Sequence, residues 1–121
     1  MAGTIVTTEI SGGEFEEVKF AWTSSAGGAA DATSVKVYSG RVLECVIVPA
    51  GGATTPSDLF DVAITDQDGI DVLHGQGANC SNAATSVVGS GLGVSVNSAL
   101  TLAVTNAGGA KTGTVILHIG V

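Results

Sequence analysis

The sequence predicts an all-β protein: a single-domain, jelly-roll-like β-sandwich of about seven to nine short antiparallel strands. Three observations lead to this prediction. Segments in which apolar and polar residues alternate recur along the chain, glycine-rich turns separate them, and Val, Ile and Thr supply many of their residues. Few windows place apolar residues at helical spacing, and glycine interrupts most of those. The length of 121 residues fits one domain, 1–121, and a partly closed barrel is the alternative architecture.

Alternation is clearest in Glu16–Thr23, where Val18, Phe20 and Trp22 share one face of the expected strand. Arg41–Pro49 is apolar on both faces, which is typical of a strand covered on both sides. Residues 1–10 are extended and carry a single charge, so we expect an N-terminal arm or an edge strand there. The strands predicted in chain order are Thr4–Ile10, Glu16–Thr23, Ser34–Ser39, Arg41–Pro49, Phe60–Thr65, Ile70–Leu73, Gly91–Val96, Leu100–Asn106 and Thr112–Val121.

Three of the connecting segments share the sequence AGGA, at Ala26–Ala29, Ala50–Ala53 and Ala107–Ala110. Their flanks do not match, so we interpret them as turns of similar chemistry rather than as an internal repeat. Glycine supplies the positive φ that such turns need. The last copy predicts a hairpin loop over Thr105–Thr112 that joins two strands paired with each other.

The formal charge is −7, and the chain has only four fixed cations: Lys19, Lys36, Arg41 and Lys111. Four scattered cations form no basic stripe, so nucleic acid is excluded as a partner and anionic membranes are disfavoured. The start of the chain lacks a secretion-signal pattern, and the apolar runs are shorter than the roughly 20 residues of a spanning helix. We therefore expect synthesis in a host cytoplasm, where Cys45 and Cys80 stay free thiols.

The stretch Thr65–Asn82 contains three aspartates, a histidine and a cysteine, more reactive groups than any other part of the chain. Carboxylates that converge from one loop suit Ca²⁺, and Asp66, Asp68 and Asp71 are the candidate ligands. The EF-hand pattern is not met, because the glycine comes too early and the distal glutamate is missing. Asp-Gly is a strong hairpin signal, so we favour a simple turn and predict no metal site.

The residues contain no recognisable catalytic constellation, so we predict that the chain is not an enzyme and needs no cofactor. A zinc set of Cys45, His74, Cys80 and His118 would lack any close pair of ligands. The segment Gly89–Gly93 has only a superficial likeness to a nucleophile elbow or a phosphate-binding glycine loop. Glycosidase chemistry would need aromatic platforms for a sugar, and one Trp, one Tyr and three Phe are few for that role.

Three segments resemble small virion proteins of tailed bacteriophages, above all capsid cement (decoration) proteins: Trp22–Asp31, Asp61–Leu73 and Leu100–Leu117. Together with the order of the strands between them, this resemblance covers most of the chain. It implies a jelly-roll or related β-fold, and a homodimer or homotrimer bound to the outer surface of an HK97-like shell of major capsid protein. Such proteins bridge neighbouring capsomers against the pressure of the packaged DNA, so the implied location is the virion.

We expect the capsid contacts in residues 2–10 and in the loops Ser24–Thr33 and Ala50–Ser57. Self-association suits a small sandwich because it buries exposed sheet edges. The predicted interface residues are Ala2, Thr4, Ile5, Val6, Phe15, Trp22 and His118. Two alternatives stay open: a structural component of a tail or baseplate, and a carbohydrate-binding β-sandwich module on a virion or cell surface.

Overall fold

The structure is a computed structural model, and it describes residues 3–11, 15–34, 37–89 and 95–120. These residues form nine strands and one turn of 3-10 helix, so the all-β prediction is confirmed. The elements are β1 (Thr4–Ser11), β2 (Phe15–Thr23), β3 (Ala30–Thr33), β4 (Tyr38–Pro49), η1 (Gly52–Thr54), β5 (Asp61–Thr65), β6 (Ser86–Val88), β7 (Ser95–Ser98), β8 (Thr101–Thr105) and β9 (Thr112–Gly120).

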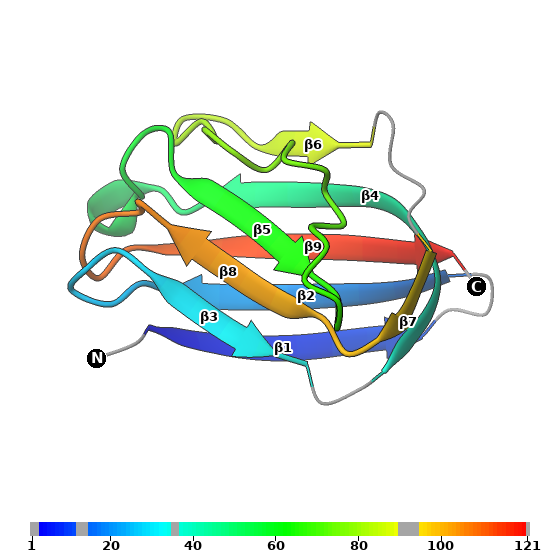
Figure 1. The fold of residues 1–121 in the computed structure, drawn as a ribbon. Helices are drawn as coiled ribbons and strands as arrows, with labels where there is room; N and C mark the ends of the chain where they lie inside the picture. The colour runs from blue at the N-terminus through cyan, green and yellow to red at the C-terminus, as the bar shows by residue number, and fades with distance from the viewer. Residues whose placement is uncertain (1–2, 12–14, 35–36, 90–94, 121) are drawn as a thin grey trace.

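The strands form two antiparallel sheets that face each other (Figure 1). The large sheet has the order β1-β2-β9-β4-β6, and β7 also pairs with β4. The small sheet has the order β3-β8-β5. A jelly roll has eight strands in two sheets, whereas the described residues place six strands in one sheet and three in the other. The antiparallel all-β fold is therefore established, and the jelly-roll assignment stays a prediction.

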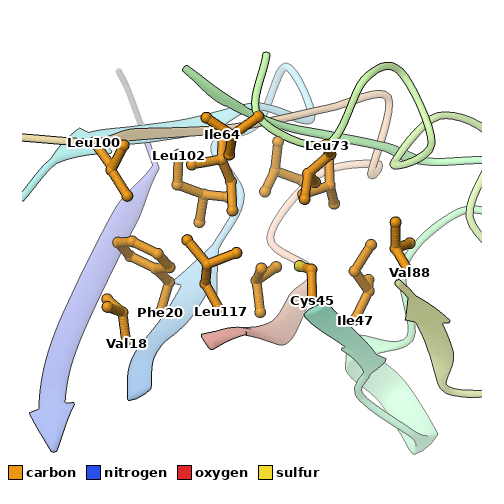
Figure 2. Close-up of a cluster of buried hydrophobic side chains, with 14 of the residues drawn as sticks. Val18, Phe20, Cys45, Ile47, Ile64, Leu73, Val88, Leu100, Leu102 and Leu117 are labelled. Carbon is orange, nitrogen blue, oxygen red and sulfur yellow. The ribbon is translucent and has the colours of Figure 1, made fainter. Parts of the chain in front are cut away.

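The inner faces of the two sheets enclose one continuous apolar core (Figure 2). Phe20 and Leu117 of the large sheet point toward Ile64 and Leu102 of the small sheet, and all four side chains are buried. In β9 every second residue is buried, as the period of a strand requires. Full burial of one such side chain stabilises the fold by about 1.5–3 kcal/mol, so this layer is the main source of stability.

Trp22 closes the core at the end of the molecule where β2 stops. Its ring is 1% exposed and packs against Phe60, with ring centroids 5.8 Å apart and planes tilted by 48°. Trp22 lies opposite Gly113 of β9, and a Cβ on Gly113 would be only 2.5 Å from Cζ2 of the indole ring. Trp22, the largest side chain of the protein, can therefore be buried only because position 113 carries no side chain.

Two of the predicted strands are placed differently in the structure, and one observed strand was not predicted. The strand expected at Ser34–Ser39 was misplaced, because β3 ends at Thr33 and β4 begins at Tyr38. β7 begins at Ser95, and most of the strand expected at Gly91–Val96 lies outside the described residues. The three-residue strand β6 was not predicted.

The expected return strand Ile70–Leu73 does not form. Asp71 makes one bridge to Thr65, and the chain then continues through turns. Val72 and Leu73 are both fully buried. Successive residues of a strand point to opposite faces, so a strand could not place both of these side chains in the core.

The expected hairpin between the last two strands is also wrong. β8 pairs with β3 and β5 in the small sheet, whereas β9 pairs with β2 and β4 in the large sheet. Residues 106–111 therefore cross from one sheet to the other. Leu102 of β8 and Leu117 of β9 still share the core, but they enter it from opposite sides (Figure 2).

The contact between Gly113 and Trp22 gives a stability prediction. We expect Gly113→Ala to lower the free energy of unfolding by about 1–3 kcal/mol, because the added methyl group must displace the indole ring. Gly51→Ala is the matched control: Gly51 has φ −98°, and nothing lies within 4 Å of its Cβ position. Urea denaturation of the two variants measures the difference, and equal stabilities would contradict the proposed packing.

Candidate functional site

The three AGGA segments lie together at one end of the sandwich, on the left of Figure 1. They belong to the β2–β3, β4–β5 and β8–β9 connections. Two of them are in direct contact, because Ala107 N donates a hydrogen bond to Gly28 O over 3.0 Å, and Ala110 N donates one to Ser25 O over 3.3 Å. We call the surface formed by residues 24–29, 50–57 and 106–111 the loop end.

Ser24 links the first and third of these loops. Its Oγ donates a hydrogen bond to Gly108 O at 2.6 Å and accepts one from Lys111 N at 2.8 Å. The second loop joins them, since Ser57 N donates a hydrogen bond to Ala107 O at 2.9 Å. The loop end is therefore a single hydrogen-bonded unit rather than three independent turns.

The close approach of the loops requires glycine at two positions. Gly28 and Gly108 have φ values of 86° and 81°, which favour a residue without a side chain. A Cβ on Gly28 would lie 3.0 Å from Gly108 N, and one on Gly108 would lie 2.6 Å from Ser57 Oγ. The AGGA sequence thus produces a compact surface of backbone and small side chains.

The second candidate surface is the outer face, the side of the large sheet that points away from the core. Antiparallel sheets commonly present charged and polar residues to solvent, but this face is mostly Val, Ile, Ala and Thr. Val6, Ala21, Thr114 and Val48 stand in register across β1, β2, β9 and β4. The residues of the outer face include Thr4, Val6, Thr8, Glu17, Lys19, Ala21, Thr23, Arg41, Leu43, Glu44, Val46, Val48, Val87, Thr112, Thr114, Ile116 and His118.

A shallow groove joins the outer face to the loop end. It has a volume of about 340 Å³, and its walls include Val6, Ala21, Val48 and Ala50. Ala21 is the smallest side chain in its row, so the groove runs between the taller side chains on β1 and β4. The two surfaces therefore form one continuous candidate contact region.

Glu17, His118 and Glu44 form a charged row across β2, β9 and β4 on the outer face. His118 Nε2 lies 3.0 Å from Glu17 Oε1, and His118 Nδ1 lies 3.3 Å from Glu44 Oε1. This row joins three strands at the end of the outer face that is remote from the groove.

The predicted interface residues have different environments. Thr4 and Val6 are exposed on the outer face, and His118 is partly exposed there. Ile5 points the other way and packs against the core. Trp22 is buried, so its side chain offers no exposed surface, and its predicted place in an interface stays a prediction. Ala2 and the side chain of Phe15 lie outside the described part of the structure.

Two of the three candidate calcium ligands, Asp66 and Asp71, accept hydrogen bonds from backbone N–H groups. Asp66 Oδ1 accepts hydrogen bonds from Asp68 N at 2.9 Å and from Ile70 N at 3.1 Å. The carboxylate of Asp71 accepts three: from Ile64 N and Leu73 N on Oδ1, and from Gly75 N on Oδ2. These aspartates therefore cap the turn. They accept hydrogen bonds from backbone N–H groups that would otherwise lack a partner, because the predicted strand Ile70–Leu73 does not form.

The two cysteines are free thiols in the core. Burial raises the pKa of Cys45 to about 12, with smaller contributions from the negative charges of Cys80, Asp71 and Glu44. Burial also raises the pKa of Cys80 to about 11, and its Sγ donates a hydrogen bond to Gly77 O. Neither thiol forms a readily available thiolate, which is the reactive species.

The residues considered for zinc are not brought together, since Cys45 and His118 lie on opposite faces of the large sheet. Within residues 3–11, 15–34, 37–89 and 95–120, no group of three or more His, Cys, Asp or Glu side chains is placed to hold a metal ion. None of the helical structure described is long and apolar enough to cross a membrane.

Comparison of the chain with protein-family models, with curated proteins and with solved structures gave no match. A functional proposal must therefore rest on the surfaces described above and on the resemblance of the three sequence segments.

The capping role of Asp71 can be tested by substitution. We expect Asp71→Asn to lower the free energy of unfolding by about 1–3 kcal/mol, because one of the accepting oxygens is replaced by a donor. Asp68→Asn is the control, since Asp68 is exposed and the described residues give its carboxylate no hydrogen bond. Chemical denaturation of both variants measures the effect, and a loss at Asp68 as large as at Asp71 would contradict the capping interpretation.

The buried thiols predict a dependence of stability on alkaline pH. Both pKa values are higher in the folded chain than the ordinary value of 9.0, so folding favours the neutral thiols. The stabilisation is complete below about pH 9 and is lost as pH rises through about 11 to 12. We expect Cys45→Ala/Cys80→Ala to lose less stability than the wild type between about pH 8 and pH 10.5, as measured by urea denaturation.

The double variant also loses packing in the core, but this loss is the same at both pH values. The difference between the two proteins in how the free energy of unfolding changes with pH therefore reports the ionisation of the thiols alone. Parallel curves for the wild type and the variant would show that the thiols do not contribute.

Proposed function

We propose that this chain is a structural protein of a tailed-phage virion: a capsid decoration protein that binds the outer surface of an HK97-like shell and bridges capsomers. The observation that carries the proposal is the continuous surface formed by the loop end and the outer face. It is rich in small apolar side chains, threonine and backbone groups, and it carries few charges. Such a surface suits a broad contact with another protein.

The shape of the candidate region favours a lattice partner over a small ligand. Its groove is shallow and lacks convergent charged groups, whereas a site for a small molecule is usually a deep cleft with a few fixed polar groups. A protein present in many copies on a shell needs no deep site, because multivalent binding converts weak contacts into strong retention. The major capsid protein is the proposed partner.

The proposed capsid contacts follow from the placement of the predicted loops. The loops expected to touch the capsid, Ser24–Thr33 and Ala50–Ser57, contribute two of the three parts of the loop end. Thr4 and Val6 add the neighbouring part of the outer face. Because hydrogen bonds already fix the loops to one another, little conformational entropy is lost when they bind.

The alternative of a carbohydrate-binding module receives no support from the aromatic side chains that the structure describes. Phe20, Trp22, Tyr38 and Phe60 are each at most 1% exposed, so none of these rings can stack on a sugar. A tail or baseplate component would use the same kind of surface, and the number of copies per particle distinguishes it from a decoration protein.

The proposal predicts that particles of the phage whose genome encodes this chain contain it in a number comparable with that of the major capsid protein. Deletion should lower the temperature at which heads release their DNA, because the bridges between capsomers are lost. Quantitative mass spectrometry and a DNA-release melting curve measure these two quantities. A few copies per particle would indicate a tail component, and absence from particles would refute both virion roles.

Binding of purified protein to particles that lack it tests the proposed surface. We expect Ala21→Glu to abolish binding, because it places a carboxylate in the groove. Ile70→Glu is the control. Ile70 is 52% exposed on the aspartate-rich turn, so this substitution adds the same charge at a site away from the groove. If both variants bind like the wild type, the groove is not the contact.

A further inference from the structure

The free edge of β1 differs from the other edges of the two sheets. β1 is the end strand of the large sheet, and its eight residues pair with β2 in an unbroken register. Its sequence, TIVTTEIS, contains no proline and no lysine, and its pairing contains no bulge. Proline, lysine and bulges are the features by which proteins protect a long edge from pairing with another strand, and β1 lacks all three.

The remaining edges are short or covered. β3 and β7 have four residues each, and β6 has three. The free side of β5 is occupied by the segment that follows it: Val62 N donates a hydrogen bond to Gly77 O, and Val72 N donates one to Ile64 O, both at 2.7 Å. Among the described residues, β1 is therefore the long strand whose outer N–H and C=O groups have no strand beside them.

We propose that β1 pairs in antiparallel fashion with β1 of a second copy of the chain, about a two-fold axis through Val6. A two-fold axis perpendicular to the sheet keeps each side chain on its own face, so only residues of the same parity can oppose each other. With the axis at Val6, Thr4 of one copy opposes Thr8 of the other, and the two Val6 side chains meet on the outer face. Val6 is 67% exposed in the single chain, and this contact covers it.

The charges of β1 do not oppose a second copy at this edge, although the chain has a net charge of −7. The only charged residue of β1 is Glu9. In the proposed register Glu9 opposes Gly3 of the other copy, and the two Glu9 residues lie six residue steps apart along the strands, roughly 20 Å at ~3.4 Å per residue. This separation exceeds the Debye length of about 8 Å at physiological ionic strength, so the two carboxylates hardly repel each other.

An axis one residue further on, at Thr7, would place Glu9 opposite Ile5 and leave Val6 beside Thr8. That register opposes a carboxylate to a side chain that packs against the core. On the outer face, the register centred on Val6 is therefore the one that matches Val to Val and Thr to Thr, and on the inner face it opposes Ile5 to Thr7. The inference concerns self-association alone and does not depend on the proposed function.

Sedimentation equilibrium of the purified full chain tests the proposal. We expect a dimer in the wild type at about 10–100 µM, and an increase in the dimer Kd of about tenfold or more for Val6→Lys, because two ammonium groups would face each other across the axis. Val87→Lys is the matched control: Val87 is 64% exposed on β6, at the opposite edge of the same sheet, and the substitution adds the same charge. It should leave the dimer unchanged.

Cross-linking provides a second measurement. We expect Val6→Cys to give a covalent dimer with a short thiol cross-linker, because the two side chains oppose each other, whereas Val87→Cys should give none. The native thiols do not interfere, since both are buried. A wild type that stays monomeric over this range overturns the proposal. So does a dimer that resists Val6→Lys, or one that both lysine variants dissociate, as face-to-face packing of the outer faces would require.

Discussion

The apolar layer between the two sheets is the constraint on which the rest of the structure depends. Each strand can bury only one face, so every inner residue must find its partner on the opposite sheet. The layer is sealed at the loop end by Trp22, whose ring needs the open position at Gly113 and packs against Phe60. Because the core ends there, the three connecting loops must close over it tightly, and small residues and glycine make that possible.

Alternation in the sequence predicted which face of β2 lies in the core, but not which strands are neighbours. The prediction that Arg41–Pro49 is covered on both faces was wrong, because only one face of β4 meets the small sheet and Leu43 is 48% exposed. Val18, Phe20 and Trp22 were correctly placed on one face, and β4, β5, β8 and β9 occur close to their expected positions. The pairing of β8 with β9 was wrong because two strands that face each other across a core show the same alternation as two strands that pair. The two arrangements differ only in which strands are joined by hydrogen bonds, and the alternation within a single strand does not show this.

The prediction of a strand after β5 was wrong for a different reason. Ile70–Leu73 has the composition of a strand, yet Val72 and Leu73 are both fully buried while Ile70 is half exposed. This pattern belongs to a capped turn that folds back over the core. The aspartates carried the signal for it, because Asp66 and Asp71 are spaced to accept hydrogen bonds from nearby N–H groups. A turn at this point was predicted from the sequence, but its consequence for the following residues was not.

The candidate surface was partly visible in the sequence. Trp22 shares its face with Val18 and Phe20, and that fact already favoured burial over a contact with a partner. The apolar character of the outer face could not be foreseen, since it arises when Val6, Ala21, Thr114 and Val48 come into register from four separate strands. A similar limit applied to the loop end, where three matching turn sequences were evident but their assembly into one unit was not.

The geometry of the β1 edge connects the two proposals. A two-fold axis perpendicular to the large sheet turns the strands of the second copy through 180° and leaves both outer faces on the same side of the combined sheet. The two loop ends then point in opposite directions along the strands, while the two grooves face the same way. A dimer of this kind offers two equivalent contact regions, one on each side of the axis and similarly oriented, to whatever surface lies beneath it. That is the arrangement that a protein bridging two neighbouring subunits of a lattice requires, because the second contact forms at a high effective concentration once the first is made.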